Sequence, residues 1–311
     1  MVNFADKLCD AISVKGNPCV VGLDFHPTLL PEFVRQRLHD TPTEQGYGTI
    51  IKDFLCRVVD SVESVVPVIK PQVSLLERFR CGGADALNGV IKHARDCGLL
   101  VIADAKRNDI ASSAEGYVAA FLAIEESDPL LPGYDADALT VNGYLGRDSL
   151  EPFRRACMKY GKGMFVLVKT SNKGSVETQD VRMNDGEAYY TVIARMVDEL
   201  GRELVGSSGF SPIGAVVGAT FPQQAQELRK LMPRALILVP GYGAQGASAD
   251  DVCASFTSDG RGAIVNASRS VVYDVGASGS DPKSYETRVR ENALRMVEDI
   301  NSALGKHCST A

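Results

Sequence analysis

Residues 99–109 read Leu99-Leu100-Val101-Ile102-Ala103-Asp104-Ala105-Lys106-Arg107-Asn108-Asp109, an apolar run that passes directly into charged residues. The first five residues are typical of a buried strand. Because side chains two apart on a strand share a face, Asp104 and Lys106 are expected to point the same way. In a central strand that direction is inward, where an unpaired charge is very costly. Asp104, Lys106 and Asp109 can satisfy one another, but buried ion pairs add little stability, so the pattern indicates a functional site.

Seven further apolar runs of strand length recur along the chain, separated by helical patterns. The eight expected strands cover residues 19–24, 65–70, 99–104, 138–142, 164–169, 214–218, 235–239 and 263–267. They are continuous and β-branched rather than alternating, as parallel strands covered on both faces are. Helical spacing is expected at residues 84–96, 112–125, 150–160, 187–204, 222–231 and 285–304.

This alternation predicts an α/β fold, a single (β/α)8 TIM barrel with an N-terminal helix and one domain over residues 1–311. A doubly wound open sheet is the alternative, because periodicity does not show closure. Two connections are longer than a barrel needs. Residues 126–135 are a surface loop by composition. Residues 171–185 could form a lid, although a simple insertion is the preferred interpretation.

Composition narrows the function classes. The 311 residues are 45% hydrophobic and carry a net charge of −6, which argues against nucleic acid as a partner. No signal peptide or membrane-length apolar run is visible, so a cytoplasmic protein is expected. The eight cysteines show no CxxC pair and the four histidines are scattered, which favours reduced thiols and indicates no metal site.

Polar residues collect at the ends of the expected strands. They are Asp24, Lys70, Asp104, Lys106, Asn142 and Lys169. In a closed barrel these ends form one rim, and barrel active sites lie there. A single charge at a strand end is usually solvated, and Lys169 is expected to extend its ammonium to water. The convergence of several such residues nevertheless favours a site.

The last two strands are followed by a pattern that suits an anion. Residues 240–246 form a glycine-rich turn, and Ser268 and Arg269 follow the final strand. Glycines let backbone N–H groups approach an anion, and arginine adds charge-assisted contacts. A glycine-rich turn alone is often only a tight connection. With Arg269 beside it, at the usual phosphate position of barrels, a phosphomonoester is the favoured ligand.

These motifs resemble the orotidine 5′-monophosphate decarboxylase family along nearly the whole chain. The matching stretches are residues 22–24, 70–72, 104–110, 140–146, 170–172, 240–246 and 268–270. The spacing of Asp104, Lys106 and Asp109 is highly specific for the superfamily, and the chain is closest to the branch that includes bacterial and protozoan enzymes. The resemblance implies conversion of orotidine monophosphate to uridine monophosphate and CO2, the last step of de novo pyrimidine (UMP) biosynthesis, with no metal or organic cofactor.

The resemblance also implies residue roles. The expected catalytic residues are Lys70, Asp104, Lys106 and Asp109, with Lys106 protonating C6 and Asp104 near the substrate carboxylate. The expected substrate-binding residues are Asp24, Gln72, Ile110, Ser113, Thr170, Ser171, Gln245, Ser268 and Arg269. A homodimer is implied, in which Asp109, Ile110 and Ser113 reach the neighbouring site. Some organisms fuse this activity to orotate phosphoribosyltransferase, which would lie outside this chain.

The chain departs from the family pattern at three positions. Asn108 and Ala111 stand where glycine is common, and Gln72 stands where an asparagine can contact substrate. Three other functions remain open: a Mg²⁺-dependent sugar-phosphate decarboxylase that uses Asp104, an aldolase type with Lys169 as Schiff-base lysine, and a catalytically silent nucleotide-binding barrel.

Overall fold

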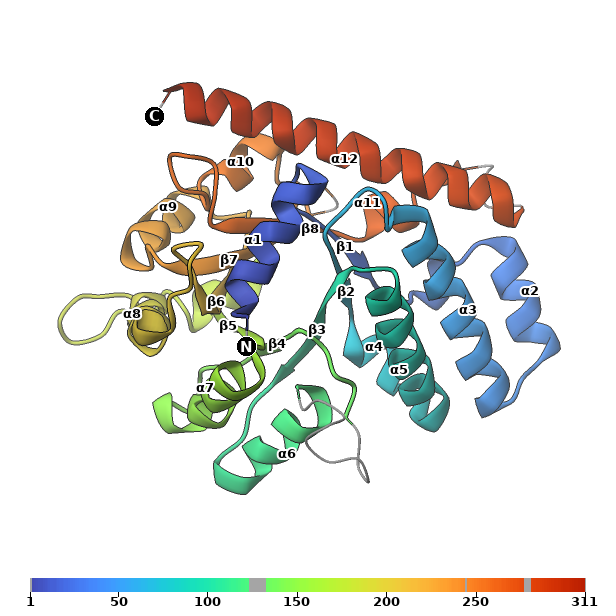
Figure 1. Cartoon of the computed structure of the whole chain (residues 1–311), viewed down its shortest axis with the longest axis horizontal. Coiled ribbons are helices and arrows are strands. Elements are labelled where there is room, and N and C mark those ends of the chain that lie inside the picture. Colours follow the sequence, from blue (N-terminus) through green and yellow to red (C-terminus); the bar gives the residue numbers. More distant parts are fainter. Residues whose placement is uncertain (1, 123–132, 244, 277–280, 311) are drawn as a thin grey trace.

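The computed structural model describes residues 2–122, 133–243, 245–276 and 281–310. Its eight parallel strands close into a barrel in chain order, and β8 pairs with β1 (Figure 1). The strands are β1 Cys19–Leu23, β2 Val68–Pro71, β3 Leu100–Arg107, β4 Ala138–Val141, β5 Gly163–Lys169, β6 Ser211–Val217, β7 Ala235–Pro240 and β8 Ala263–Ala267. The predicted barrel is therefore confirmed, and the open-sheet alternative is wrong.

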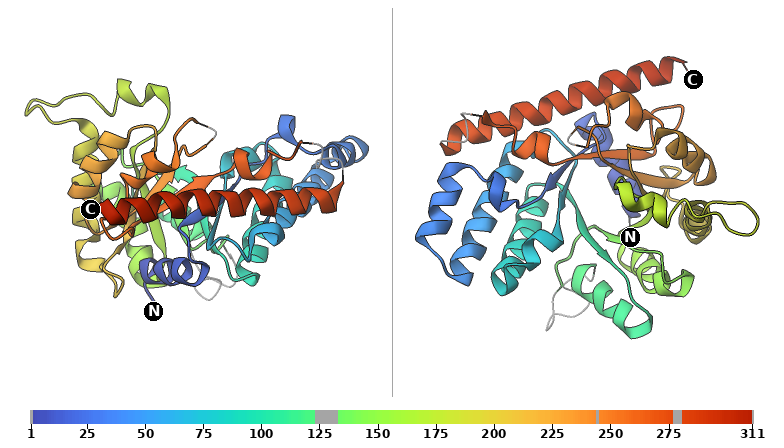
Figure 2. Two further views of the ribbon diagram at one scale, coloured as in Figure 1. Left: turned by 90° about the horizontal axis from the view of Figure 1, so that it is seen from above. Right: turned by 180° about the vertical axis from the view of Figure 1, so that it is seen from behind.

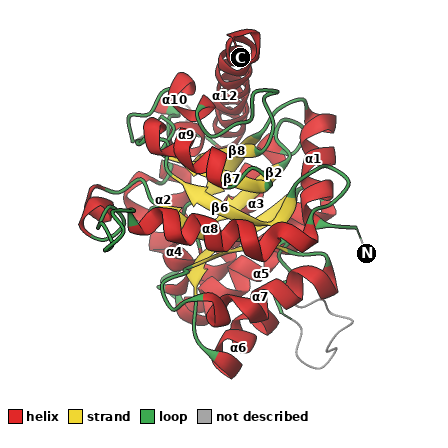
Figure 3. Cartoon of the chain, turned by 90° about the vertical axis from the view of Figure 1, so that its left-hand side faces the viewer, coloured by secondary structure: helices red, strands yellow, loops and turns green. Residues whose placement is uncertain are grey.

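Helices surround the strands (Figure 3). They are α1 Phe4–Lys15, α2 Glu32–Asp40, α3 Glu44–Val62, α4 Val73–Glu77, α5 Arg80–Asp96, α6 Ala111–Phe121, α7 Arg147–Tyr160, α8 Tyr189–Gly201, α9 Pro222–Leu231, α10 Ala249–Cys253, α11 Arg269–Val272 and α12 Pro282–Thr310, with 3-10 turns η1 Pro27–Leu29, η3 Lys173–Glu177 and η4 Arg202–Leu204. All six predicted helices are present, with the predicted ends for α9 and shifted ends for the others, and the expected N-terminal helix is α1. Residues 123–125 of the helix predicted over 112–125 lie outside the described residues.

Helix α3, one of the longer helices, was not predicted from the sequence, because glycines interrupt its pattern. Gly48 lies in α3 where a Cβ atom would come within 2.5 Å of the Gly82 carbonyl oxygen of α5. Glycine normally weakens a helix, but here it allows two backbones to approach closely. The two helices therefore pack tightly against each other, with α3 on the outside of β1 and α5 on the outside of β3.

The barrel interior is filled by one cluster of apolar side chains, with α1 beneath it. Val20, Val68, Ile102 and Phe165 are buried there, and the ring of Phe4 from α1 meets the ring of Phe165 edge-on at 6.1 Å between centroids. This packing closes the amino-terminal end of the barrel. The polar rim at the other end of the strands is thus the only face of the described barrel that is left for a site.

The long helix α12 lies along one side of the barrel and spans most of the molecule (Figure 2). Its buried Tyr285 donates a hydrogen bond to the Val272 carbonyl of α11 at 3.1 Å. Among the described residues, no helix combines the length and apolar character that crossing a membrane requires. Of the predicted loop 126–135, residues 126–132 lie outside the described residues, and the single-domain expectation for residues 1–311 stays a prediction.

Candidate active site

Strand β3 continues three residues beyond its predicted end and is irregular there. Lys106 has a φ of +50°, and the pairing with β4 shifts register between Ala103 and Arg107. The Lys106 amide donates a hydrogen bond to Thr140 Oγ1 at 3.0 Å. A non-glycine residue in this left-handed region costs about 1–3 kcal/mol, and such strain concentrates at functional sites.

Asp104 is the centre of the polar cluster at the rim. Both lysines form ion pairs with Asp104: Lys70 Nζ contacts Asp104 Oδ2, and Lys106 Nζ is 2.5 Å from Asp104 Oδ1. Thr140 Oγ1 donates to Oδ1 at 2.9 Å, and Gln72 Nε2 donates to Oδ2 at 3.2 Å. The side chains of Lys70 and Asp104 are 5% and 8% exposed, whereas that of Lys106 is 44% exposed. Lys106 is thus the cation of the cluster that faces the mouth of the barrel.

The charges in this cluster alternate and stabilise one another. Burial alone would raise the pKa of Asp104, but Lys70 and Lys106 hold that pKa well below its ordinary value. Burial alone would lower the pKa of Lys70, but Asp104 and then Asp24 raise it. The site therefore holds both carboxylate and ammonium charged in a region with little water.

Polar atoms without partners lie beside this cluster. Asp24 Oδ1, Asn266 Oδ1 and Ser268 Oγ are buried and form no hydrogen bond with the residues that the structure describes. Asn266 and Ser268 both lie against Gly22 of β1, two residues before Asp24. Buried polar atoms in native proteins are nearly always hydrogen-bonded, so these groups indicate a ligand that brings hydroxyl donors.

The loops after β5 and β7 meet on the same rim. Gly241 has a φ of +107°, and a Cβ atom there would lie 3.4 Å from Gln245 Oε1 and 3.5 Å from Ser171 Cβ. Thr170 is held by Gln179, whose Oε1 accepts from the Thr170 amide at 2.9 Å. Arg269 begins α11 at the end of β8 and its side chain is exposed. The structure thus brings Ser171 and Gln245 together, with exposed Arg269 on the adjacent strand end.

The expectation that Lys169 extends to water is wrong. Its side chain is fully buried, and Nζ lies 2.6 Å from Asp180 Oδ1 and 4.3 Å from the ring centroid of Phe221. The pairing of β5 with β6 shifts register just before Lys169, and residues 171–185 fold back to supply Asp180. The apolar pattern of β5 does not predict this ion pair, because Asp180 belongs to the loop that follows the strand.

Asp109, Ile110 and Ser113 do not join the cluster within one chain. The Asp109 carboxylate accepts from the Ile110 amide at 2.7 Å, and Ile110 is 57% exposed. Ser113 is exposed on the first turn of α6. Ala111, one of the two departures from glycine, has a φ of +45°, which glycine adopts more easily. The intrachain pairing expected for Asp109 is therefore absent from the described residues.

Two polar residues of the site had no assigned role in the sequence analysis. Thr140 binds Asp104 directly, and Asn266 carries one of the unpartnered oxygens. Each lies near the end of a strand, and the residue two positions earlier is buried in the barrel: Ala138 before Thr140, and Ile264 before Asn266. That alternation is the signal which could have found them.

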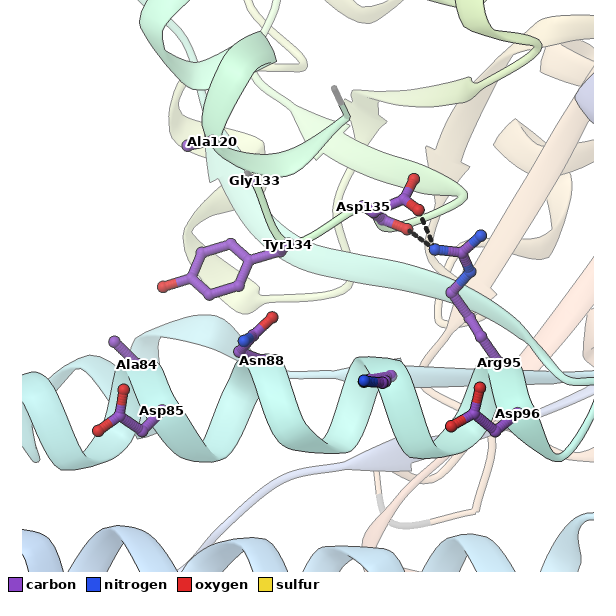
Figure 4. Close-up of a pocket in the computed structure, with 10 residues that line it drawn as sticks. Ala84, Asp85, Asn88, Arg95, Asp96, Ala120, Gly133, Tyr134 and Asp135 are labelled. Carbon is purple, nitrogen blue, oxygen red and sulfur yellow. Dashed lines mark hydrogen bonds and ion pairs between the residues drawn. The ribbon is translucent and has the colours of Figure 1, made fainter. Parts of the chain in front are cut away.

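A hollow of about 920 Å³ lies away from the rim between α5 and residues 133–135 (Figure 4). Arg95 of α5 spans this hollow, and its Nη1 donates a hydrogen bond to the Asp135 carbonyl oxygen at 3.2 Å. Its lining comes from helix surfaces and not from the strand ends. The volume of a cavity therefore does not locate the chemistry in this protein.

The sequence profile of the orotidine 5′-phosphate decarboxylase / HUMPS family matches residues 17–276. The chain belongs to this family. Curated orotidine 5′-phosphate decarboxylases resemble it over nearly their full lengths. The one from Rhodopirellula baltica is 41% identical, covering 96% of this chain and 99% of the relative. The one from Caldicellulosiruptor bescii is 36% identical, covering 88% and 90%.

Solved structures agree with the membership in the orotidine 5′-phosphate decarboxylase / HUMPS family. The Leishmania donovani OMP decarboxylase superposes with a TM-score of 0.73 at 28% identity, covering 98% of this chain and 99% of the other. The Leishmania donovani UMP synthase gives 0.75 at 29% identity, but the match covers only 57% of that longer chain. The expectation that the chain is a carboxy-lyase of this family is confirmed.

Proposed function

We propose that the chain decarboxylates orotidine 5′-monophosphate to uridine 5′-monophosphate and CO2 in pyrimidine biosynthesis, with Lys106 protonating C6. The observation that supports this most strongly is the cluster in which Asp104 contacts both Lys70 and Lys106 at the carboxyl ends of the strands. The names of the closely matching relatives support the same substrate.

The cluster suits a reaction that develops negative charge on carbon. Loss of CO2 from C6 leaves a carbanion that the pyrimidine ring does not delocalise, so electrostatic stabilisation must come from the protein. Lys106 is the more exposed ammonium of the cluster and is the one that can face the substrate. It would stabilise the carbanion and then donate its proton there.

Asp104 has two parts in this proposal. It fixes Lys106 through the 2.5 Å contact, and it lies where the substrate carboxylate would enter. Its lowered pKa keeps it anionic, so it disfavours a neighbouring carboxylate and favours release of neutral CO2. Lys70 balances the charge of Asp104 from the buried side.

The rest of the substrate would bind along the rim. The unpartnered oxygens of Asp24 and Asn266 suit ribose hydroxyls. Ser171 and Thr170 would contact the base, and Gln245, Ser268 and Arg269 would bind the phosphate. Gln72 is held by Asp104, so we assign it to the support of the cluster beside the ribose. Phosphate contacts remote from C6 can supply binding energy that organises the site.

The site is proposed to be completed by a second copy of the chain. Asp109 makes no ion pair among the described residues, and Ile110 is exposed at the same rim. In a homodimer, Asp109, Ile110 and Ser113 would enter the neighbouring site. We further propose a cytoplasmic enzyme, and in organisms that fuse it to orotate phosphoribosyltransferase the partner domain lies outside this chain.

Two rival functions fit the geometry less well. A Mg²⁺ ion at Asp104 would have to displace the two ammonium groups that already bind both carboxylate oxygens. A Schiff-base lysine must present a neutral amine to its substrate, whereas Lys169 is buried against Asp180. Both objections concern the side chains themselves and do not depend on family membership.

The experiment is an absorbance assay with orotidine monophosphate, run with and without EDTA. We expect turnover that the chelator leaves unchanged, and much slower turnover of orotidine, which lacks the phosphate. Loss of activity with EDTA would favour the metal-dependent rival. A covalent adduct trapped by borohydride would favour the aldolase type, and binding of uridine monophosphate without turnover would favour the silent barrel. Any of these results would refute the proposal.

A further inference from the structure

A cluster of three metal-ligating side chains lies at the opposite end of the barrel, between α3 and α5. Asp60 is in the last turn of α3, His93 is in the last turn of α5, and Cys97 caps α5. One ligand atom from each residue lies within 4.8 Å of the other two. Because both helices run towards the amino-terminal ends of the strands, this cluster is remote from Asp104.

We infer that Asp60, His93 and Cys97 form a binding site for a transition-metal cation, with Zn²⁺ as the best match, which links α3 to α5. A carboxylate, an imidazole and a thiolate are the three ligand types that Zn²⁺ takes in proteins. The mixed set with sulfur excludes Mg²⁺ and Ca²⁺ as preferred ions, since these favour oxygen ligands. This inference does not rest on the proposed function.

The distances are close to those of a metal site. His93 Nε2 is 2.6 Å from Asp60 Oδ1, and Cys97 Sγ is 3.9 Å from His93 Nε2. Tetrahedral Zn²⁺ places such nitrogen and oxygen ligands about 3.4 Å apart, and nitrogen and sulfur about 3.6 Å apart. Binding therefore requires the His93–Asp60 distance to increase and the His93–Cys97 distance to decrease, each by less than about 1 Å. Side-chain rotation can supply that movement because His93 and Asp60 are partly exposed.

The surroundings favour a cation. Glu63, the residue after the end of α3, is a neighbour of Cys97 and could supply a fourth ligand. The carbonyl ends of two helices add partial negative charge. Within the described ranges, no lysine or arginine forms an ion pair with Asp60 or Glu63, although Lys15 binds the backbone oxygen of Glu63 at 2.6 Å.

The spacing explains why the sequence analysis predicted no metal site. His93 and Cys97 are four residues apart, so they share one face of α5. Asp60 of α3 and Glu63, just past its end, are three residues apart, and neither pair by itself is a metal motif. Only the close packing of α3 on α5, which Gly48 permits, brings the two pairs together. Coordination would release the thiol proton to solvent, so binding should weaken as the pH falls.

The test is titration of the chelator-treated, dialysed full chain with Co²⁺ and, separately, with Zn²⁺. We expect about one Co²⁺ per chain with a thiolate-to-cobalt charge-transfer band, displaced by Zn²⁺, and a higher melting temperature with Zn²⁺. Cys97→Ser should remove the band, and His93→Gln or Asp60→Asn should weaken binding about tenfold or more.

Two exposed positions supply matched controls. Cys81→Ser removes an exposed thiol, and His39→Gln removes an exposed histidine that lies 3.3 Å from a neighbouring aspartate without a cysteine. Both variants should bind Co²⁺ like the unmodified chain. Absence of the charge-transfer band, or a band that persists in Cys97→Ser and is lost in Cys81→Ser, would overturn the inference. His93→Gln lies on a surface position, so an unchanged Co²⁺ affinity in that folded variant would do the same.

Discussion

Asp104 is the residue on which the rim depends. Its carboxylate accepts hydrogen bonds from Lys70, Lys106, Thr140 and Gln72 while its side chain is only 8% exposed. A buried carboxylate is tolerated when its partners are this complete. Replacing a buried ion pair with apolar side chains of similar volume often costs no stability, so stability alone does not explain why these charges are buried here.

Substitution of Asp104 should therefore be costly to folding as well as to activity. Asp104→Asn leaves the Lys70 ammonium buried without its anion, and we expect the free energy of unfolding to fall by about 3–5 kcal/mol. Urea denaturation measures this value. Asp109→Asn is the matched control, since Asp109 forms no ion pair within the described residues, and it should change stability by less than about 1 kcal/mol. Equal effects of the two substitutions would contradict the account.

The pH dependence of that difference follows from the two shifted groups. Asp104 has a lowered pKa, so its contribution is present above about pH 4 and is lost as the pH falls through the lowered value. Lys70 has a raised pKa, so its contribution is present below about pH 10 and is lost as the pH rises through the raised value. The stability difference between the unmodified chain and Asp104→Asn should be largest near pH 5 and should narrow towards pH 9, because burial without the Asp104 anion lowers the Lys70 pKa in the variant and lets this lysine become neutral. Urea denaturation of both chains between about pH 5 and 9 measures the difference, and a difference that widens as the pH rises would contradict the account.

At the scale of elements, the segment 171–185 is more than a tolerated insertion. Asp180 reaches the buried Lys169 at the end of β5, and Gln179 holds Thr170 on the rim. The loop therefore fixes the residues that are proposed to contact the base. Lys169 is best described as a positioning residue, because its ammonium binds Asp180 and Ser175 of the following loop.

Asp180→Asn should loosen this segment. The buried Lys169 would lose its anion, and displacement of Thr170 and Ser171 should lower kcat/KM by about 10- to 100-fold, mainly through KM. Limited proteolysis should cut within residues 171–185 faster than in the unmodified chain. Asp185→Asn is the control, since Asp185 accepts from the Glu187 amide within its own turn. Unchanged KM and unchanged cleavage in Asp180→Asn would contradict the positioning role.

The elements show where sequence patterns succeed and where they stop. Each strand was detectable, because a parallel strand buried on both faces is an uninterrupted apolar run. Helix α3 was not, because Gly48 serves a contact with α5 that no local pattern records. The same limit applies to the site: Asp104 and Lys106 lie two residues apart on one strand, whereas the anion for Lys169 and the Asp60 ligand beside Cys97 come from other segments.

At the scale of the whole molecule, the rim of one chain looks incomplete. Asp109 and the exposed Ile110 lie at the barrel mouth without joining the cluster, which is consistent with a role in a second copy. In a symmetric dimer each subunit would give these residues to its partner.

Hybrid dimers test that exchange. Lys106→Ala and Asp109→Asn should each be inactive alone, but co-expression should restore activity. The hybrid has one site with both substitutions and one with neither, so random pairing should return about one quarter of the normal sites. Activity no greater than that of the separate variants would show that each chain completes its own site.

The central claim is that Lys106 carries the chemistry, and the most direct measurement is kcat for orotidine monophosphate in EDTA with Lys106→Ala. Lys173→Ala, an exposed lysine in the 171–185 segment, is the control. Circular dichroism should show both variants folded, since Lys70 still balances Asp104. The account predicts that kcat falls at least about 10⁴-fold in Lys106→Ala and is unchanged in Lys173→Ala. A folded Lys106→Ala enzyme that keeps kcat within about tenfold of the unmodified chain would contradict it.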